Sequence, residues 1–191
     1  MRVGLGQEAL LLETEAALGN ATLSAVHAYW CRIKGENEVA LRRDLDPTEI
    51  GPKLLPYSIL VDVNTELRTV HHRVVGTHFS EFFGRDITGM ELSSVIDGDY
   101  REFILGLYML ACERKVAVAA HSRFRWDQGR LLKASRLMMP LSRAGGRADM
   151  CYTCQVIEAG EGLSQPQVHT ATRDGWEDVS GRFSHFSIDV V

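Results

Sequence analysis

The order of the predicted elements indicates an α+β fold, an antiparallel sheet with helices on one face. Three observations lead to this expectation: two strand-like runs near the middle of the chain, one long amphipathic helix after them, and three further strand-like runs. The 191 residues, 45% hydrophobic and 24% charged, are enough for one domain with its own hydrophobic core.

Two helices are predicted before the first strand. Residues 8–18 can form a short helix, and residues 22–34 form a firmer one, with Thr22 or Ser24 as N-cap and Gly35 as the stop. The second helix carries an apolar stripe at helical spacing, made by Val26, Tyr29, Trp30 and Ile33.

A hairpin is predicted in the next part of the chain. Asp46 and Pro47 form an N-cap and first helical position that open one short helical turn. Strand-like runs at 57–63 and 67–75 then flank a turn-forming Asn-Thr-Glu sequence. Residues 77–96 are expected to form loops and short helical turns.

The second half of the domain is predicted as one helix and three strands. Residues 99–115 have helical period, with acidic residues at the start and basic ones at the end, as the helix dipole favours. Strands follow at 116–126, 131–141 and 150–157. Residues 159–191 are a polar tail, either flexible or packed on a neighbour, with a late β-like piece at 183–191.

Local motifs sharpen this order of elements. They are Tyr29-Trp30-x-x-Ile33-Lys34-Gly35, Asp44-x-Asp46-Pro47, Leu55-Pro56-x-x-x-Leu60-Val61-Asp62-Val63, Arg73-Val74-Val75-Gly76-Thr77 and Phe83-Gly84-Arg85-Asp86-Ile87-Thr88-Gly89. The chain thereby resembles a bacterial subgroup of the PAS domain family, mostly small single-domain proteins. One departure is that Val39-Ala40-Leu41 stands where the family usually has a proline after the first helix.

The resemblance covers residues 22–158 and implies an organisation in three parts. These are an N-terminal extension over 1–21, a PAS-like domain over 22–158 that includes the helix 22–34, and the polar tail over 159–191. It implies a PAS-like five-stranded antiparallel sheet with helices on one face, preceded by the N-terminal helix or helices. It also implies a ligand pocket between sheet and helices and a role as sensor or interaction module, and it does not imply an enzyme.

A candidate binding site follows from the hairpin predicted between the strands at 116–126 and 131–141. A turn at Gln128-Gly129 that pairs Trp126 with Leu131 places Ser122 opposite Ser135 on an apolar inner face. Tyr152 continues this face on the last strand. The opposite face carries His121, Arg123, Arg125 and Arg136 and is suited to water or to a partner.

His72 is the fourth candidate ligand-binding residue, beside Ser122, Ser135 and Tyr152. It shares the inner face of its strand with Val70, as residues two apart do. Three interpretations stay open: a core histidine bonded to backbone, a group that recognises a ligand, or an axial haem or metal ligand. The two serines can equally bond to each other or to water.

No cofactor is assigned, since the sequence has no haem, flavin or metal signature. Cys151 and Cys154 have the spacing of a metal pair, but residues three apart on a strand face opposite sides. The histidines downstream, His169 and His185, are also too far apart for a zinc finger. The site is therefore predicted to hold no metal and no catalytic residue.

Charge and hydropathy exclude other classes of partner. A net charge of −4 and a pI near 6.0 argue against nucleic-acid binding, which requires a concentrated basic face. No apolar run is long enough for a membrane helix, and no signal peptide is recognised, which makes the cytoplasm the expected location.

The first functional hypothesis is a cytoplasmic sensory or regulatory module that binds a small ligand, a protein partner or both. A homodimer is expected through the N-terminal helix, whose apolar stripe needs a cover. No output domain is recognised, so any output is expected to act through another molecule. The alternatives are a ligand-free interaction or dimerisation module and, third, a small enzyme in a pocketed α+β fold.

Overall fold

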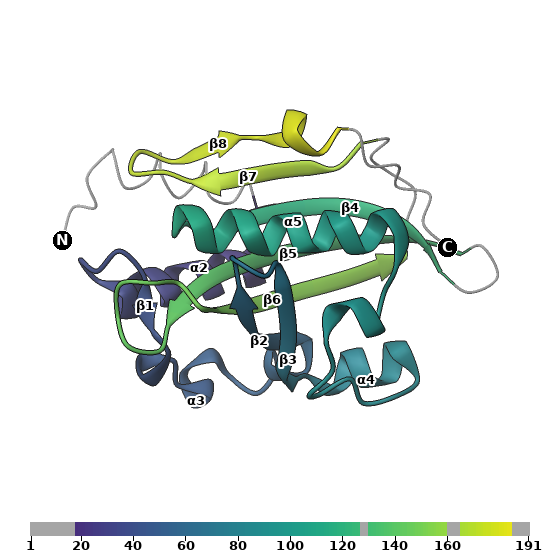
Figure 1. The fold of residues 1–191 in the computed structure, drawn as a ribbon, viewed down its shortest axis with the longest axis horizontal. Coiled ribbons are helices and arrows are strands. Elements are labelled where there is room, and N and C mark those ends of the chain that lie inside the picture. The colour runs from purple at the N-terminus through teal and green to yellow at the C-terminus, as the bar shows by residue number, and fades with distance from the viewer. Residues whose placement is uncertain (1–17, 127–129, 160–164, 185–191) are drawn as a thin grey trace.

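An antiparallel sheet forms the centre of the computed structural model, which describes residues 18–126, 130–159 and 165–184 (Figure 1). Its five longer strands are β2 (Ser58–Asn64), β3 (Thr69–Val75), β4 (Val118–Trp126), β5 (Arg130–Ser142) and β6 (Met150–Ala159). They lie in the order β3-β2-β6-β5-β4. The predicted α+β class, with its antiparallel sheet, several helices and an N-terminal helix, is confirmed.

Two long helices cover opposite faces of this sheet. Helix α5 (Gly98–Arg114) lies across the face turned to the viewer in Figure 1, and α2 (Ala21–Lys34) lies behind the sheet. Leu107 of α5 belongs to one buried cluster, together with Met138 of β5. Trp30 of α2 belongs to a second cluster with Leu137 of β5. Helices thus occupy both faces, because neighbouring residues of each strand supply apolar side chains to both sides.

Short elements connect these layers. They are β1 (Ala40–Leu41), which pairs with β5 in parallel, η1 (Arg42–Asp44), α3 (Pro47–Ile50), η2 (Leu55–Tyr57), α4 (Thr77–Phe83) and η3 (Leu92–Ser94). The predicted Asp46-Pro47 start is confirmed, since the Asp46 carboxylate accepts a hydrogen bond from the Thr48 amide at 2.8 Å. Of these short elements, α4 and η3 lie on the α5 side of the sheet.

The cap of α2 differs from the prediction. Asn20 is the N-cap, and its side-chain oxygen accepts from the amides of Thr22 and Leu23, so neither Thr22 nor Ser24 serves. Gly35 ends the helix with φ of 54°, as predicted. The helix predicted over 8–18 lies outside the described residues, apart from Leu18.

The apolar stripe of α2 packs inward. Val26, Tyr29 and Trp30 are buried against the second face of the sheet, and the Trp30 indole Nε1 donates to the carbonyl of Pro140 at 3.1 Å. The stripe therefore has its cover within the chain. This removes the reason for expecting it to form the dimer contact.

The hairpin of β4 and β5 is displaced by one residue from the predicted register. Trp126 pairs with Arg130 rather than Leu131, so Ser122 lies opposite Ala134 and His121 lies opposite Ser135. The prediction of a Ser122–Ser135 pair was wrong because a one-residue slip exchanges the two faces of a strand. The faces of β4 were assigned correctly, and those of β5 were inverted.

The C-terminal tail extends the sheet. Strands β7 (Gln167–Ala171) and β8 (Trp176–Asp178) add to the free edge of β4, and η5 (Ser180–Phe183) follows (Figure 1). The Phe183 ring packs edge-on against Phe103 of α5, with centroids 5.7 Å apart. The tail thus joins the α5-side core of its own chain. The late β-like piece lies outside the described residues beyond Ser184.

Candidate functional site

A cavity of about 290 Å³ lies between the sheet, α5 and the segment that contains α4 and η3. Strands β2, β3, β5 and β6 each contribute to its wall, through Ile59, His72, Met138 and the pair Thr153 and Gln155. A volume of this size accommodates a small organic molecule.

The helical wall of the cavity is mainly aromatic. It is lined by Phe79, Phe82 and Phe83 from α4 and by Tyr100 and Tyr108 from α5. On the rim, Ser93, Ser94 and Asp97 are exposed to solvent. The cavity therefore combines an apolar interior with a polar entrance, the arrangement common in small-molecule sites.

The loop that closes the aromatic wall is built from the Gly84–Gly89 motif. Gly84 and Gly89 have φ of 66° and 79°, values that glycine adopts without strain. The Asp86 carboxylate accepts from the Thr88 amide at 2.8 Å, a bond that lowers the pKa of Asp86. The motif thus forms a tight turn, and it directs the fully buried Ile87 into the cavity wall.

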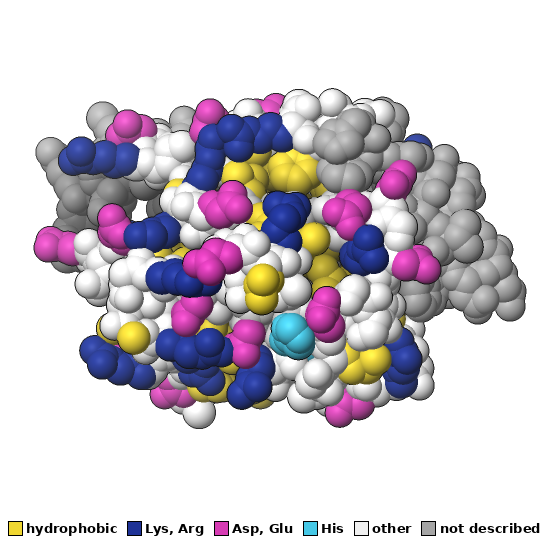
Figure 2. All heavy atoms as spheres, in the orientation of Figure 1, with side chains coloured by type: hydrophobic (Ala, Val, Ile, Leu, Met, Phe, Trp, Pro, Cys, Tyr) yellow, Lys and Arg dark blue, Asp and Glu magenta, His cyan; other side chains and the backbone are white. Residues whose placement is uncertain are grey.

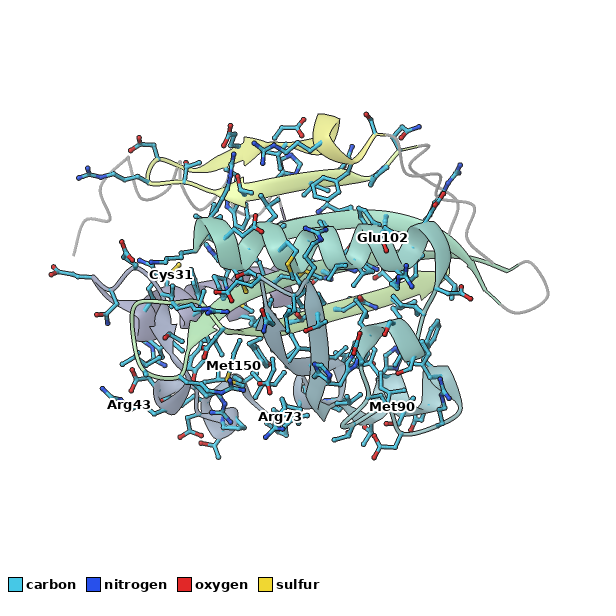
Figure 3. All side chains as sticks on the ribbon, in the orientation of Figure 1. Cys31, Arg43, Arg73, Met90, Glu102 and Met150 are labelled. Atoms are coloured by element: carbon cyan, nitrogen blue, oxygen red, sulfur yellow. The ribbon has the colours of Figure 1, made fainter. Side chains whose placement is uncertain are left out.

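His72 joins this loop to the sheet. Its backbone amide and its ring Nδ1 both donate to the carbonyl of Met90, at 2.9 Å each, and its own carbonyl accepts from Gly89. Figure 3 shows Met90 beside α4. Because a carbonyl only accepts, Nδ1 carries the hydrogen and Nε2 is left as an acceptor. Burial lowers the pKa of His72, which favours this neutral form.

A pair of hydroxyls lines the side of the cavity next to β6. Thr153 donates from Oγ1 to the Tyr108 hydroxyl at 3.3 Å, and both residues are buried. Burial raises the pKa of Tyr108, so its hydroxyl stays protonated. The phenol accepts from Thr153 and retains its own hydrogen as a donor.

Arg136 lies directly behind this polar side. Its side chain is 0% exposed and donates from Nε to Gln155, from Nη1 to Ser122 and from Nη2 to Tyr100. Two of these acceptors, Gln155 and Tyr100, line the cavity. The prediction that Arg136 faces water or a partner was wrong, for the same reason of register.

The four predicted site residues do not form one cluster. His72 lines the cavity, and Ser122 lies on the same face of the sheet, where it binds Arg136. Ser135 Oγ bonds to His121 Nδ1, and Gly19, which precedes α2, lies next to the His121 ring. Tyr152 lies in the cluster beneath α2 and bonds to Ser58 at 2.6 Å. The inner-face assignment of Tyr152 and Ser135 was therefore wrong, and their role in ligand binding stays a prediction.

Sequence reasoning missed the polar residues that do line the cavity. Thr153 and Gln155 lie on the face of β6 opposite to Tyr152. Alternation along a strand indicates that these two polar residues share a face, but it does not indicate whether that face meets α5. Tyr108 lies among the apolar residues of its helix, where nothing in the pattern indicates a role for its hydroxyl. An expectation of helices on both faces of the sheet would have allowed Thr153 and Gln155 to be assigned to the α5 side.

The cysteines are placed as the strand geometry predicted. Cys151 belongs to the cluster under α5 and Cys154 to the cluster under α2, so the two thiols face opposite sides. Burial raises the pKa of Cys112 and of Cys154 to about 12, and that of Cys151 well above its ordinary value. These thiols stay protonated and are weak nucleophiles and metal ligands. Within the described ranges, no three His, Cys, Asp or Glu residues are grouped to hold a metal.

The surface above α5 carries interspersed acidic and basic side chains (Figure 2). Several of them pair on the surface, including Arg101 with Glu102 and Arg114 with Glu177 of β8. Glu102 is labelled on α5 in Figure 3. In the part of the chain that the structure describes, no helix has the length and apolar composition needed to span a bilayer.

Comparison with known families gives one match. The family described as PAS domain matches residues 19–154, which include α2, strands β2 to β5, the first half of β6, and the whole wall of the cavity except Gln155. Strands β7 and β8 lie beyond the match. No curated protein and no solved structure matches the chain.

Proposed function

The protein belongs to the PAS domain family, a family of sensory and regulatory modules, and we propose that it senses a small ligand held in the cavity between α5 and the sheet. The observation that carries this proposal is the cavity itself. Its aromatic lining and its small set of fixed polar groups fit a recognition site. No enzymatic step is part of the proposal.

The segment between α4 and α5 is the element that a ligand would bias. Its residues line the cavity with Ile87, Leu92 and the rim at Ser93 and Asp97. It is attached to β3 at the three backbone and ring bonds of His72. A ligand that contacts both the sheet and this segment would shift the conformational equilibrium of the segment. A partner protein that binds the surface of the segment would respond to that shift.

A homodimer remains part of the proposal in a restricted form. The apolar stripe of α2 is buried, and the large hydrophobic side chains exposed in the described residues are Leu55, Leu67 and Val74. A dimer would therefore use surfaces other than this stripe. Light scattering at tens of micromolar protein tests it, and a strict monomer counts against it.

Native mass spectrometry of freshly purified protein tests the ligand proposal. We expect a reproducible added mass that is absent from an Ile59→Phe variant, because the larger ring occupies the cavity that Ile59 lines. Val74→Phe is the matched control, since it adds a ring at a residue 56% exposed on β3. Absence of any added mass, and of any thermal shift with a library of small molecules, would contradict the proposal.

A further inference from the structure

Arg136 is a buried cation whose hydrogen-bond partners among the described residues are all neutral. Its three hydrogen bonds, of 2.8 to 2.9 Å, end on an amide oxygen, a serine hydroxyl and a tyrosine hydroxyl. Among the described residues, no carboxylate lies within ion-pair distance of it. Buried charges in proteins are ordinarily paired, because a charge removed from water loses its solvation.

Three of the five N–H groups of Arg136 donate to these partners, and no carboxylate of the described residues pairs with its charge. The guanidinium carbon lies 5.9 Å from the ring centroids of both Tyr100 and Phe103, so the aromatic faces supply part of the stabilisation. A guanidinium keeps its charge in proteins. Its positive potential therefore extends into the adjoining cavity, where apolar walls screen it weakly.

The arginine also fixes the hydrogen-bond polarity of the cavity wall. A guanidinium only donates, so the amide oxygen of Gln155 must be the atom that faces it. The amide nitrogen of Gln155, a residue that lines the cavity, is then left as a donor. Tyr108 retains its hydroxyl hydrogen as a second donor, because Thr153 already donates to its oxygen.

The other ionisable groups of the cavity lie elsewhere on its wall. Asp97 is exposed at the rim, where water screens its charge. His72 is neutral and presents an acceptor, Nε2, from β3, which is separated from Arg136 on β5 by β2 and β6. The cavity thus has an electropositive, donor-rich side at Gln155 and an acceptor at His72.

Building on the proposed sensing function, we propose that the ligand is a small, largely apolar carboxylic acid. Its carboxylate accepts hydrogen bonds from Gln155 and Tyr108, and Arg136, behind the wall, supplies the opposite charge. The aromatic residues of α4 and α5 enclose its apolar part. The carboxylate of the ligand then supplies the negative charge that the described neighbours of Arg136 lack.

Isothermal titration with matched acid and amide pairs tests this assignment. The probes are 3-phenylpropanoate with 3-phenylpropanamide, and octanoate with octanamide, each titrated into the unmutated protein. We expect at least one acid to bind ten times or more tightly than its amide. The acid's advantage should also shrink as salt is raised, although less than for an exposed pair.

Gln155→Glu separates the charge effect from folding. The new carboxylate pairs with Arg136 and repels the acid, so we expect a tenfold or greater loss for the acid and less than a threefold change for the amide. Val74→Glu adds the same charge at an exposed residue and should leave both affinities unchanged. Arg136→Met is the direct variant, and Gln155→Glu keeps the test decisive if Arg136→Met does not fold.

The outcomes distinguish this inference from the function on which it rests. Equal affinities of acid and amide in both pairs, or an acid affinity unaffected by Gln155→Glu, overturn the carboxylate assignment while the cavity remains a binding site. Failure of all four probes and of the small-molecule library overturns both.

Discussion

The two faces of the sheet differ in how completely their side chains fill the space under the helices. Beneath α2, Trp30 is buried with Leu137 and Met139, and polar groups are satisfied in pairs, as in Tyr152 with Ser58. Beneath α5, the same strands border a cavity of about 290 Å³ with polar groups facing into it. We infer that the α2 face supplies stability and that the α5 face is left open for a ligand.

Removal of Trp30 is expected to have the largest effect on stability. Trp30→Ala removes a ring that is 97% buried and leaves the Pro140 carbonyl without its donor. The free energy of unfolding should fall by about 3–5 kcal/mol, measured by urea denaturation. Trp30→Phe retains most of the packing and should cost less than half as much. A loss below about 1 kcal/mol for Trp30→Ala would show that the α2 face is not the stabilising one.

His27, also on α2, should make stability depend on pH. Its ring lies against Trp176, with centroids 5.0 Å apart, and burial lowers its pKa from 6.5 to about 4. The unfolded chain therefore binds a proton that the folded chain does not, and stability falls as pH falls from about 6.5 to 4. The shift corresponds to at most about 3 kcal/mol. Burial of His72 acts in the same direction.

Urea denaturation at several pH values measures this dependence. His27→Gln removes the titrating ring and should flatten the stability profile between about pH 6.5 and 4, with the slope due to His72 remaining. An unchanged slope in the variant would contradict the assignment to His27.

Ile59 and Leu60 allow the two faces to be compared at adjacent residues of β2. Ile59 lines the cavity, and Leu60 belongs to the filled cluster beneath α2. Leu60→Phe should cost about 1–3 kcal/mol because it overpacks a filled core, whereas Ile59→Phe enters open space and should cost less than about 1 kcal/mol. Thermal unfolding of both variants measures the difference, and equal losses would mean that the faces are equally packed.

Tyr152→Phe is expected to have the smallest effect of the substitutions beneath α2. Ser58 donates its hydrogen to the Leu54 carbonyl at 2.8 Å, so the Tyr152 hydroxyl is the donor of the 2.6 Å bond between them. Loss of this single bond should cost about 1 kcal/mol. Ligand binding should be unaffected, since Tyr152 lies beneath α2. A binding defect in a stable Tyr152→Phe variant would restore it as a site residue.

The sequence predicted the elements better than their faces. Local signals are sufficient for elements: Asp46 caps its helix, Gly35 ends α2, and the strands β2 to β6 lie within a few residues of their predicted positions. The long helix predicted over 99–115 is α5, shifted by one residue.

Which face of each strand meets α5 was harder to predict, because both faces of the sheet are buried. Apolar residues then occur at odd and even positions, and the alternation that normally fixes register is weak. Ser135 and Arg136 were exchanged between the layers for this reason. A buried arginine is also contrary to the usual preference of charged residues for the surface, so only the structure could place Arg136 at the site.

Backbone-amide NMR during titration with the acid and amide probes tests the central claim most directly, because it locates binding on one face. We predict that shifts concentrate at Ile59, His72, Thr153 and Gln155, while Leu23, Trp30 and Leu137 beneath α2 stay unchanged. Shifts confined to the α2 face, or no shifts on the α5 face with a probe that calorimetry shows to bind, would contradict a receptor cavity between α5 and the sheet.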